Sequence, residues 1–289
     1  MLAMLENERP APDLDAHALR EPGDRESYPL ASLDARPSSA DAHDDANCVM
    51  PYILEELTTK SLHFSICEIQ SRMRLDDPFA LDLEYTRLMM GFLLFVPDPL
   101  RITMVGLGGG SLAKFCWRHL PRARIDVVEI NRHVIALRDA FHVPRDDHRF
   151  RVIAGDAACH VRGRRDECDV LIVDGFDEGG QPSRLCSSRF YDDARAMLAP
   201  GGVMVVNLHT GHRRHDVHVS RIRRSFGQAV LGVDDPDGSN QIVFALKAPA
   251  FAACPDDVGD QCARLGAAAN RQLRAAFGHV RAAHGKHFP

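Results

Sequence analysis

The sequence predicts an α/β protein built on a doubly wound, mainly parallel sheet, and three observations predict it. A short apolar run, Ile102–Val105, stops at a glycine cluster, and a helix-like stretch follows from Leu112 to His119. Further apolar runs then alternate with helix-like stretches as far as residue 246. Acidic residues stand at or near the carboxyl ends of several runs, which is where such sheets bind their ligands.

Strands and helices are expected in alternation from residue 81 onward. Strands are expected at Ile102–Val105, Ile125–Ile130, Phe150–Ile153, Val170–Asp174, Val203–Leu208 and Gln241–Leu246. Helices are expected at Leu112–His119, Arg132–Phe141, Ala157–Arg164, Ser188–Leu198 and Val217–Phe226. Leu81–Phe95 is apolar at helical spacing and ends before Pro97. Pro200-Gly201-Gly202 predicts a turn, and Asp256–Phe277 predicts one or two closing helices.

The N-terminal part divides into two regions. Residues 1–47 are acidic, contain five prolines and lack a hydrophobic period, so we expect a disordered leader there. Tyr52–Leu57 and Ser61–Gln70 alternate apolar with polar residues, as half-buried antiparallel strands do. We therefore expect a small β-hairpin element over residues 48–80, packed on a nucleotide-binding catalytic domain over residues 81–289.

Composition disfavours several classes of protein. The leader holds eleven acidic residues against four arginines, a net charge of −7, so residues 48–289 sum to +2. A nearly neutral body gives no support for nucleic-acid binding. The eight cysteines form no C-x-x-C pair and the fifteen histidines show no zinc-binding spacing, so we expect reduced thiols and no metal. We see no signal peptide and no membrane-spanning run, and we expect a cytoplasmic protein.

Three acids stand at or near the carboxyl ends of successive predicted strands. Glu129 lies about 20 residues beyond the glycines, where a carboxylate can hold both ribose hydroxyls. Asp156 is placed to reach an adenine amino group, and Asp174 ends Val170–Asp174. The glycine loop reads Gly-Leu-Gly-Gly-Gly-Ser and lacks the G-x-G-x-x-G pattern of NAD enzymes. The pattern resembles instead the Rossmann-like fold of class I adenosylmethionine-dependent methyltransferases.

A more specific resemblance begins at Asp174. Three segments carry it: Asp174-Gly175-Phe176-Asp177, then Phe190-Tyr191, then Leu198-Ala199-Pro200-Gly201-Gly202. They resemble the D-x-x-D, F-Y and L-x-P-G-G motifs of the spermidine synthase (polyamine aminopropyltransferase) family. The glycine loop, Glu129-Ile130 and Gly155-Asp156-Ala157 resemble the same family in order and spacing.

The family resemblance implies a role for each matching residue. Gly106, Gly108 and Gly110 would line the methionine-derived chain of the nucleotide, Glu129 would hold the ribose, and Asp156 with Ala157 the adenine. Asp174 would accept a proton from the attacking amine, Asp177 would help to hold that amine, and Gln70 and Tyr85 would lie at the substrate entrance. The implied reaction transfers an aminopropyl group from decarboxylated S-adenosylmethionine to an amine or polyamine and releases methylthioadenosine.

The chain departs from the family at two positions near the amine. The family's glycine loop has Asp where this chain has Gly109, and its Y-[HQ]-E-M motif has Glu where this chain has Arg87. Both changes remove negative charge, so a methyltransferase that uses intact S-adenosylmethionine is the first alternative, with Arg87 near the methionine carboxylate. Arg87 could equally be a surface residue. A non-catalytic nucleotide-binding homologue is the second alternative, and a homodimer is one option for assembly.

Overall fold

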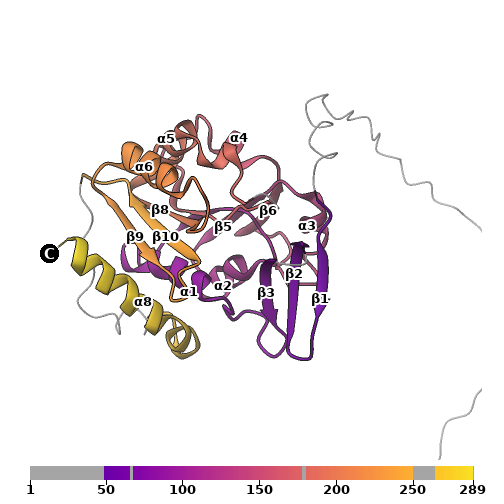
Figure 1. Cartoon of the computed structure of the whole chain (residues 1–289). Coiled ribbons are helices and arrows are strands. Elements are labelled where there is room, and N and C mark those ends of the chain that lie inside the picture. The colour runs from indigo at the N-terminus through magenta and orange to yellow at the C-terminus, as the bar shows by residue number, and fades with distance from the viewer. Residues whose placement is uncertain (1–48, 66–67, 178–179, 250–263, 289) are drawn as a thin grey trace, which may run out of the picture.

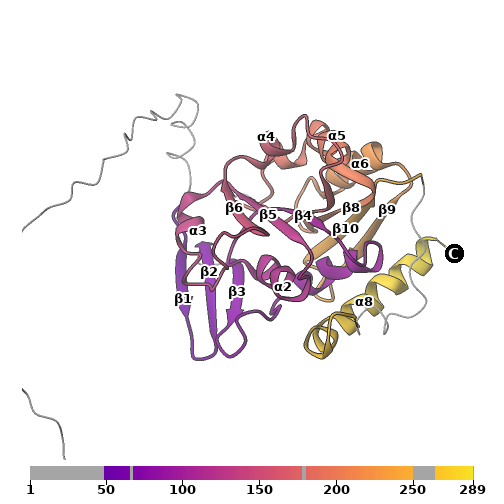
Figure 2. The ribbon, with the colours of Figure 1, turned by 180° about the vertical axis from the view of Figure 1, so that it is seen from behind.

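A computed structural model describes residues 49–65, 68–177, 180–249 and 264–288, so the expected leader at residues 1–47 lies outside the described residues. The described strands form two sheets, one of three strands near the N-terminus and one of seven strands. Figures 1 and 2 show the larger sheet at the centre of the molecule, with helices on both faces and the smaller sheet to one side.

The seven-stranded sheet has the order β6-β5-β4-β7-β8-β10-β9. Its strands are β4 (Arg101–Val105), β5 (Arg124–Glu129), β6 (Phe150–Ala154), β7 (Cys168–Val173), β8 (Leu198–His209), β9 (Val230–Asp234) and β10 (Asn240–Leu246). The first five strands in this order pair in parallel, and β10 runs antiparallel to both of its neighbours. The chain reverses its direction of winding between β4 and β7, where such sheets bind ligands. The predicted doubly wound fold is confirmed.

Two hydrophobic cores lie on the two faces of this sheet. One holds side chains of α1 (Glu84–Met89), η2 (Met90–Leu94), α2 (Ser111–His119), α3 (Arg132–Ala136) and α8 (Ala267–His287). The other holds those of α4 (Ala157–Val161), η3 (Ser183–Cys186), α5 (Ser188–Met197) and α6 (His215–Phe226). Along β7, Val170 and Ile172 enter the first core, while Leu171 and Val173 enter the second. Because both faces are covered, the strand is apolar at consecutive positions.

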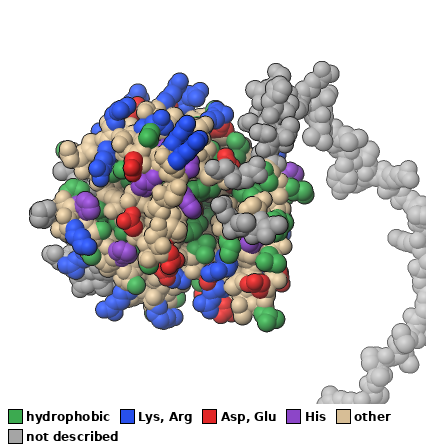
Figure 3. Space-filling view, viewed as in Figure 1, with side chains coloured by type: hydrophobic (Ala, Val, Ile, Leu, Met, Phe, Trp, Pro, Cys, Tyr) green, Lys and Arg blue, Asp and Glu red, His purple; other side chains and the backbone are tan. Residues whose placement is uncertain are grey.

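The outer surface of the second helical layer is rich in arginine. Arg189 and Arg195 of α5 and Arg223 and Arg224 of α6 are exposed. Figure 3 shows Lys and Arg side chains gathered on the side of the molecule where these helices lie. The helices are therefore amphipathic, with their apolar stripe on the sheet and their charges in water.

The N-terminal sheet has three strands where the sequence pattern predicts a hairpin. They are β1 (Tyr52–Glu55), β2 (Thr59–Ser65) and β3 (Glu68–Arg74), all antiparallel. The stretch Ser61–Gln70, predicted as one strand, divides between β2 and β3, so that prediction was wrong. The alternation itself is real, because Leu62 and Met73 enter the first core while Tyr52 and Leu54 stay exposed.

Two predicted helices are shorter in the structure. The helix predicted at Arg132–Phe141 ends at Ala136, because the next two N–H groups bond to carbonyls three residues back instead of four. The helix predicted at Ala157–Arg164 ends at Val161, because Arg162 is extended and Gly163 is left-handed. Apolar spacing continues past both helix ends, so it overestimated their lengths.

Other boundaries also differ from the sequence pattern. Leu81–Phe95 forms the short helix α1 followed by the 3-10 helix η2. Pro200-Gly201-Gly202 is an irregularity inside β8, where the pairing with β7 shifts register, and not a turn before it. Strand β9 was not predicted. Of the closing segment, residues 256–263 lie outside the described residues, and α8 runs beyond Phe277 to His287.

Candidate active site

A pocket of about 710 Å³ opens at the carboxyl ends of β4, β5, β7 and β8. Its volume is in the range of small-molecule sites. The sequence-predicted residues that line it are Gln70, Tyr85, Gly106, Gly108, Glu129, Asp156, Ala157, Asp174 and Asp177. Gly110 is outside the lining and forms the left-handed N-cap of α2. The fold thus brings together nine of the ten predicted residues, from segments spread over more than 100 positions of the chain.

Gly106 allows the ends of β4 and β7 to approach each other. Its φ is +92°, and a Cβ atom there would lie 2.4 Å from the carbonyl oxygen of Asp174. The Gly106 N–H donates to the Val128 carbonyl at 2.9 Å, and the Asp174 N–H donates to the Val105 carbonyl at 2.9 Å. Only glycine fits this crossing of backbones, so the position of Asp174 depends directly on the glycine loop.

Glu129 ties the glycine loop to the loop after β5. The residue is 8% exposed, and its Oε2 accepts from the Leu107 N–H at 2.7 Å while Oε1 accepts from the Asn131 N–H at 2.8 Å. Burial raises the pKa of Glu129, and the backbone N–H groups oppose that rise. Each carboxylate oxygen has a second lone pair, so Glu129 can still accept hydrogen bonds from ligand hydroxyls.

Asp156 caps α4 and pairs with an arginine that the sequence analysis missed. Its Oδ1 accepts from the N–H groups of Ala158 and Cys159 at 2.7 and 3.2 Å. Its Oδ2 lies 2.6 Å from Nη1 of Arg184, whose side chain is 55% exposed. Both residues line the pocket. A ligand amino group at Asp156 must therefore share Oδ2 with Arg184 or displace it.

Asp174 follows β7 and is held by two neutral side chains. Its Oδ1 accepts from Nδ2 of Asn207 at 3.0 Å, and its Oδ2 accepts from the Tyr85 hydroxyl at 3.3 Å. Burial raises the pKa of Asp174, and these two hydrogen bonds lower it in part. Burial and the nearby carboxylate raise the pKa of Tyr85 well above its usual range, so its hydroxyl stays protonated.

The remaining predicted residues, Gln70 and Asp177, line the same pocket as Asp174. Asp177 is exposed, and its backbone exchanges hydrogen bonds with Gly180 at 2.8 and 3.1 Å. Gln70 of β3 lines the same pocket, as do His209 and Asn240, which the sequence analysis missed. This part of the pocket therefore joins one exposed carboxylate to amide and imidazole groups.

The structure explains the glycine at position 109. A Cβ atom there would lie 2.8 Å from Oγ of Ser71 and 2.9 Å from Cδ1 of Phe141. Phe141 is 1% exposed, so it cannot move aside easily. Ser71 and Phe141 therefore fill the space in which the family resemblance would place an acidic side chain.

Arg87 takes no part in the pocket. Its guanidinium donates to the carbonyl oxygens of Leu81 and Asp82 at 2.9 and 3.2 Å and pairs with the Glu84 carboxylate. These contacts hold the start of α1, and Arg87 is outside the pocket lining. The methyltransferase alternative therefore loses the cation that the sequence suggested for a methionine carboxylate.

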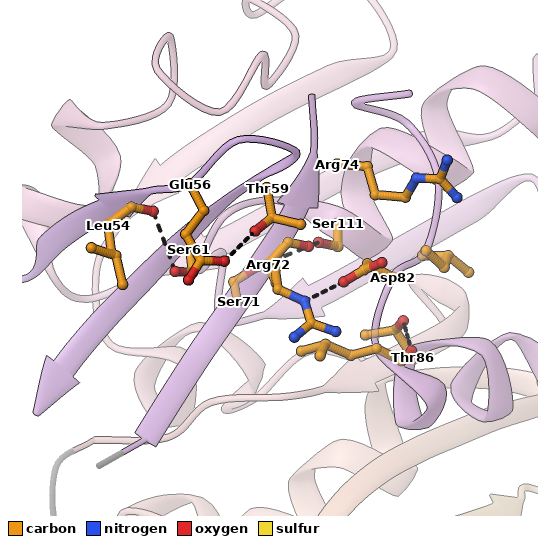
Figure 4. Close-up of polar contacts among 12 residues, drawn as sticks. Leu54, Glu56, Thr59, Ser61, Ser71, Arg72, Arg74, Asp82, Thr86 and Ser111 are labelled. Carbon is orange, nitrogen blue, oxygen red and sulfur yellow. Dashed lines mark hydrogen bonds and ion pairs between the residues drawn. The ribbon is translucent and has the colours of Figure 1, made fainter. Parts of the chain in front are cut away.

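Two serines connect the small sheet to the glycine loop. Ser71 of β3 and Ser111 at the start of α2 both line the pocket, and their hydroxyl oxygens are 3.3 Å apart. Figure 4 shows them side by side, next to the ion pair between Arg72 and Asp82. The sequence gives no signal for these serines, because their proximity comes from the packing of β3 on α2. Asn207 does leave a signal, because it is a polar residue in the apolar run of β8.

The described residues lack two other kinds of feature, a metal-binding cluster and a membrane-spanning helix. No group of three or more His, Cys, Asp or Glu side chains among them is arranged to hold a metal ion. No helix in the described part of the chain is both long and apolar enough to cross a membrane.

Comparisons with known proteins show which family this chain resembles. The family model described as the spermine/spermidine synthase domain matches residues 83–231. A polyamine aminopropyltransferase of Chromobacterium violaceum is 38% identical over 196 residues, which cover 68% of this chain and 75% of the relative. A polyamine aminopropyltransferase of Neisseria meningitidis serogroup A is 37% identical over 197 residues, with the same coverage.

Solved structures show the same fold. A probable spermidine synthase from Corynebacterium glutamicum superposes with a TM-score of 0.63 at 20% identity, covering 79% of this chain and 91% of the other. A spermidine synthase in complex with the transition state analogue AdoDATO superposes with a TM-score of 0.55 at 18% identity, covering 81% and 88%. The fold, the match of the domain and the identity to the bacterial relatives together show that this chain belongs to the spermine/spermidine synthase family.

Proposed function

We propose that this chain transfers an aminopropyl group from decarboxylated S-adenosylmethionine to an amine or polyamine, with Asp174 as the general base. The observation that carries the proposal is the position of Asp174 beside the glycine loop, where neutral groups hold both of its oxygens. Relatives named polyamine aminopropyltransferase support the same class of reaction.

The nucleotide would occupy the part of the pocket formed by β4, β5 and β6. Gly106 and Gly108 leave bare backbone against which the sulfonium chain can lie. Glu129 would accept from the ribose hydroxyls with its free lone pairs. Asp156 would receive the adenine amino group beside Arg184, and Ala157 would contact the adenine.

The chemical step needs a carboxylate next to the amine. A protonated amine has no lone pair, so Asp174 first binds it as a cation and then takes one of its protons. The nitrogen lone pair attacks the carbon next to the sulfonium, a new C–N bond forms and the C–S bond breaks. The sulfur keeps the electron pair of that bond and leaves as the neutral thioether of methylthioadenosine. Because the sulfonium is already a good leaving group, the protein mainly has to hold the partners in line.

The acceptor would enter beside Gln70 and Asp177. An exposed carboxylate at Asp177 attracts a cationic amine toward Asp174. We assign Tyr85 the role of orienting the carboxylate of Asp174, since its hydroxyl donates to Oδ2.

Product analysis tests this function. The purified protein is incubated with decarboxylated or intact S-adenosylmethionine and a panel of diamines and polyamines, and methylthioadenosine and adenosylhomocysteine are followed separately. We expect methylthioadenosine from the decarboxylated donor, and an Asp237→Asn variant, which changes an exposed turn residue, serves as the active control. Adenosylhomocysteine as the only product would instead show methyl transfer.

A further inference from the structure

Asn207 lies buried beside Asp174 with one half of its side-chain amide unused. The residue is 3% exposed, its Nδ2 donates to Oδ1 of Asp174, and its backbone carbonyl accepts from Nε2 of Gln181 at 3.0 Å. Its Oδ1 is buried and has no hydrogen-bond partner among the described residues. Such a group is destabilising, because a buried acceptor loses its water without a replacement.

The direction of the amide follows from the charge of Asp174. An ionised carboxylate only accepts hydrogen bonds, so the NH₂ group of Asn207 must face it, and Oδ1 must face away. A protonated Asp174 carries an O–H donor, and an amide rotated by half a turn can accept from it through Oδ1. Asn207 therefore has a hydrogen bond to offer in both protonation states of Asp174. Tyr85 has the same property, because a hydroxyl both donates and accepts.

A charged partner could not serve both states. A lysine or arginine at position 207 would stabilise the carboxylate strongly and disfavour its uptake of a proton. No salt bridge to Asp174 is found among the described residues, whereas Asp156 has Arg184. The two acids are thus held differently, and only Asp174 has partners that tolerate a change of charge.

We propose that Asn207 is the positioning residue of Asp174, and that its amide holds the carboxylate before proton transfer and the carboxylic acid after it. The proposal rests on the proposed function, because it assumes that Asp174 accepts a proton during turnover. It also accounts for the unpartnered oxygen, which is the half of the amide that the protonated state uses.

The test compares Asn207→Leu, which removes both halves of the amide at similar size, with Asn207→Gln, which keeps them. We expect Asn207→Leu to lower kcat by about 10- to 100-fold, the scale of a hydrogen bond to a charged group. The acid limb of its pH–rate profile should move to higher pH, because Asp174 loses a donor that favours its ionised form. Binding of methylthioadenosine should change little, and Asn207→Gln should recover both kcat and the pH profile in large part.

The thermal stability of the Asn207 variants gives a second measurement. Asn207→Leu leaves Oδ1 of Asp174 without its donor, so it should melt below the wild type at neutral pH. Asn270→Leu on α8 is the matched control. If Asn207→Leu does not fold, Asn207→Ala takes its place. A variant that keeps wild-type kcat and pH profile would reduce Asn207 to a structural residue and overturn the proposal.

The proposal can fail separately from the function. If the wild type makes no methylthioadenosine with any amine, the proposed function is wrong, and carbon-13 NMR titration of Asp174 still measures its pKa with and without the Asn207 amide. A pKa of Asp174 that stays the same in Asn207→Leu overturns the role of Asn207 whatever the reaction. A pKa that rises supports it.

Discussion

The two halves of the pocket hold their carboxylates in opposite ways. In the part of the pocket proposed to hold the nucleotide (the nucleotide half), Glu129 and Asp156 accept hydrogen bonds from backbone N–H groups. In the part proposed to hold the amine (the amine half), the partners of the Asp174 carboxylate among the described residues are the side chains of Tyr85 and Asn207. A backbone N–H can only donate, so it favours the ionised form of an acid. Hydroxyl and amide side chains can also accept, and they suit an acid whose charge changes during the reaction.

The largest expected effect lies in the amine half. Asp174→Asn keeps the shape of the side chain but removes the base, so turnover should fall by roughly 10²–10⁴, the usual contribution of a positioned base. Nucleotide affinity should change much less, because the nucleotide half is untouched. Rates of methylthioadenosine release and calorimetry with methylthioadenosine measure the two quantities. Loss of nucleotide binding equal to the loss of turnover would show that the two halves are not separate.

The next effect belongs to the nucleotide half. Glu129→Ala should weaken the binding of methylthioadenosine by about 1.5–3 kcal/mol, the scale of a hydrogen bond to a charged group. Calorimetry measures it, with Glu167→Ala as a control on a partly exposed acid outside the pocket. An unchanged affinity would remove Glu129 from the ribose site and leave it as a link between two loops.

The same contrast explains what the sequence could predict. The nucleotide half is built from local segments, each a strand, its loop and the first turn of a helix, so Gly106, Glu129 and Asp156 could be placed by their position after a strand. The partners of Asp174 come from elsewhere, since Tyr85 is 89 positions away and Asn207 is 33. Tyr85 was found through the family resemblance, and Asn207 was missed because one polar residue in a buried strand has several explanations.

Residues brought close by packing were the least predictable. Ser71 contacts the glycine loop only because β3 lies against α2, and Arg184 reaches Asp156 from a 3-10 helix that the sequence pattern does not reveal. Neither contact has a local signal such as a cap or a periodic spacing. The predicted ends of α3 and α4 were wrong for a similar reason. Apolar residues continue in the loops that follow these helices, so the sequence pattern does not mark where they end.

A smaller effect is expected at Gly109, where the space for a side chain is already filled. Gly109→Ala should destabilise the fold by about 1–3 kcal/mol, the usual cost of overpacking, because its Cβ would press on Ser71 and Phe141. Gly278→Ala in α8, where a Cβ meets nothing within 4 Å, is the matched control and should be neutral or stabilising. Chemical denaturation measures both. If Gly109→Ala were as stable as the wild type, the absence of an acid at this position would not be explained by lack of space.

The smallest effect contrasts the two acids by the pH dependence of stability. Burial raises the pKa of Asp174 in the folded state, so its ionisation opposes folding. The contribution of Asp174 to stability is therefore fully present below the ordinary pKa of an aspartate, and it is lost as the pH rises through the raised pKa. Asp174→Asn removes the buried charge, and Tyr85 and Asn207 can each donate to or accept from the new amide. Its melting temperature should therefore match the wild type in acid and exceed it toward neutral pH.

The pKa of Glu129 is also raised by burial, yet Glu129→Gln should behave differently. The N–H groups of Leu107 and Asn131 can only donate, and one of them would face the NH₂ group of the glutamine. That clash leaves two donors unpaired, so Glu129→Gln should melt below the wild type at neutral pH. Thermal melts of both variants from pH 4 to 8 make the comparison. A Glu129→Gln variant that gains stability like Asp174→Asn would mean that the kind of hydrogen-bond partner does not distinguish the two acids.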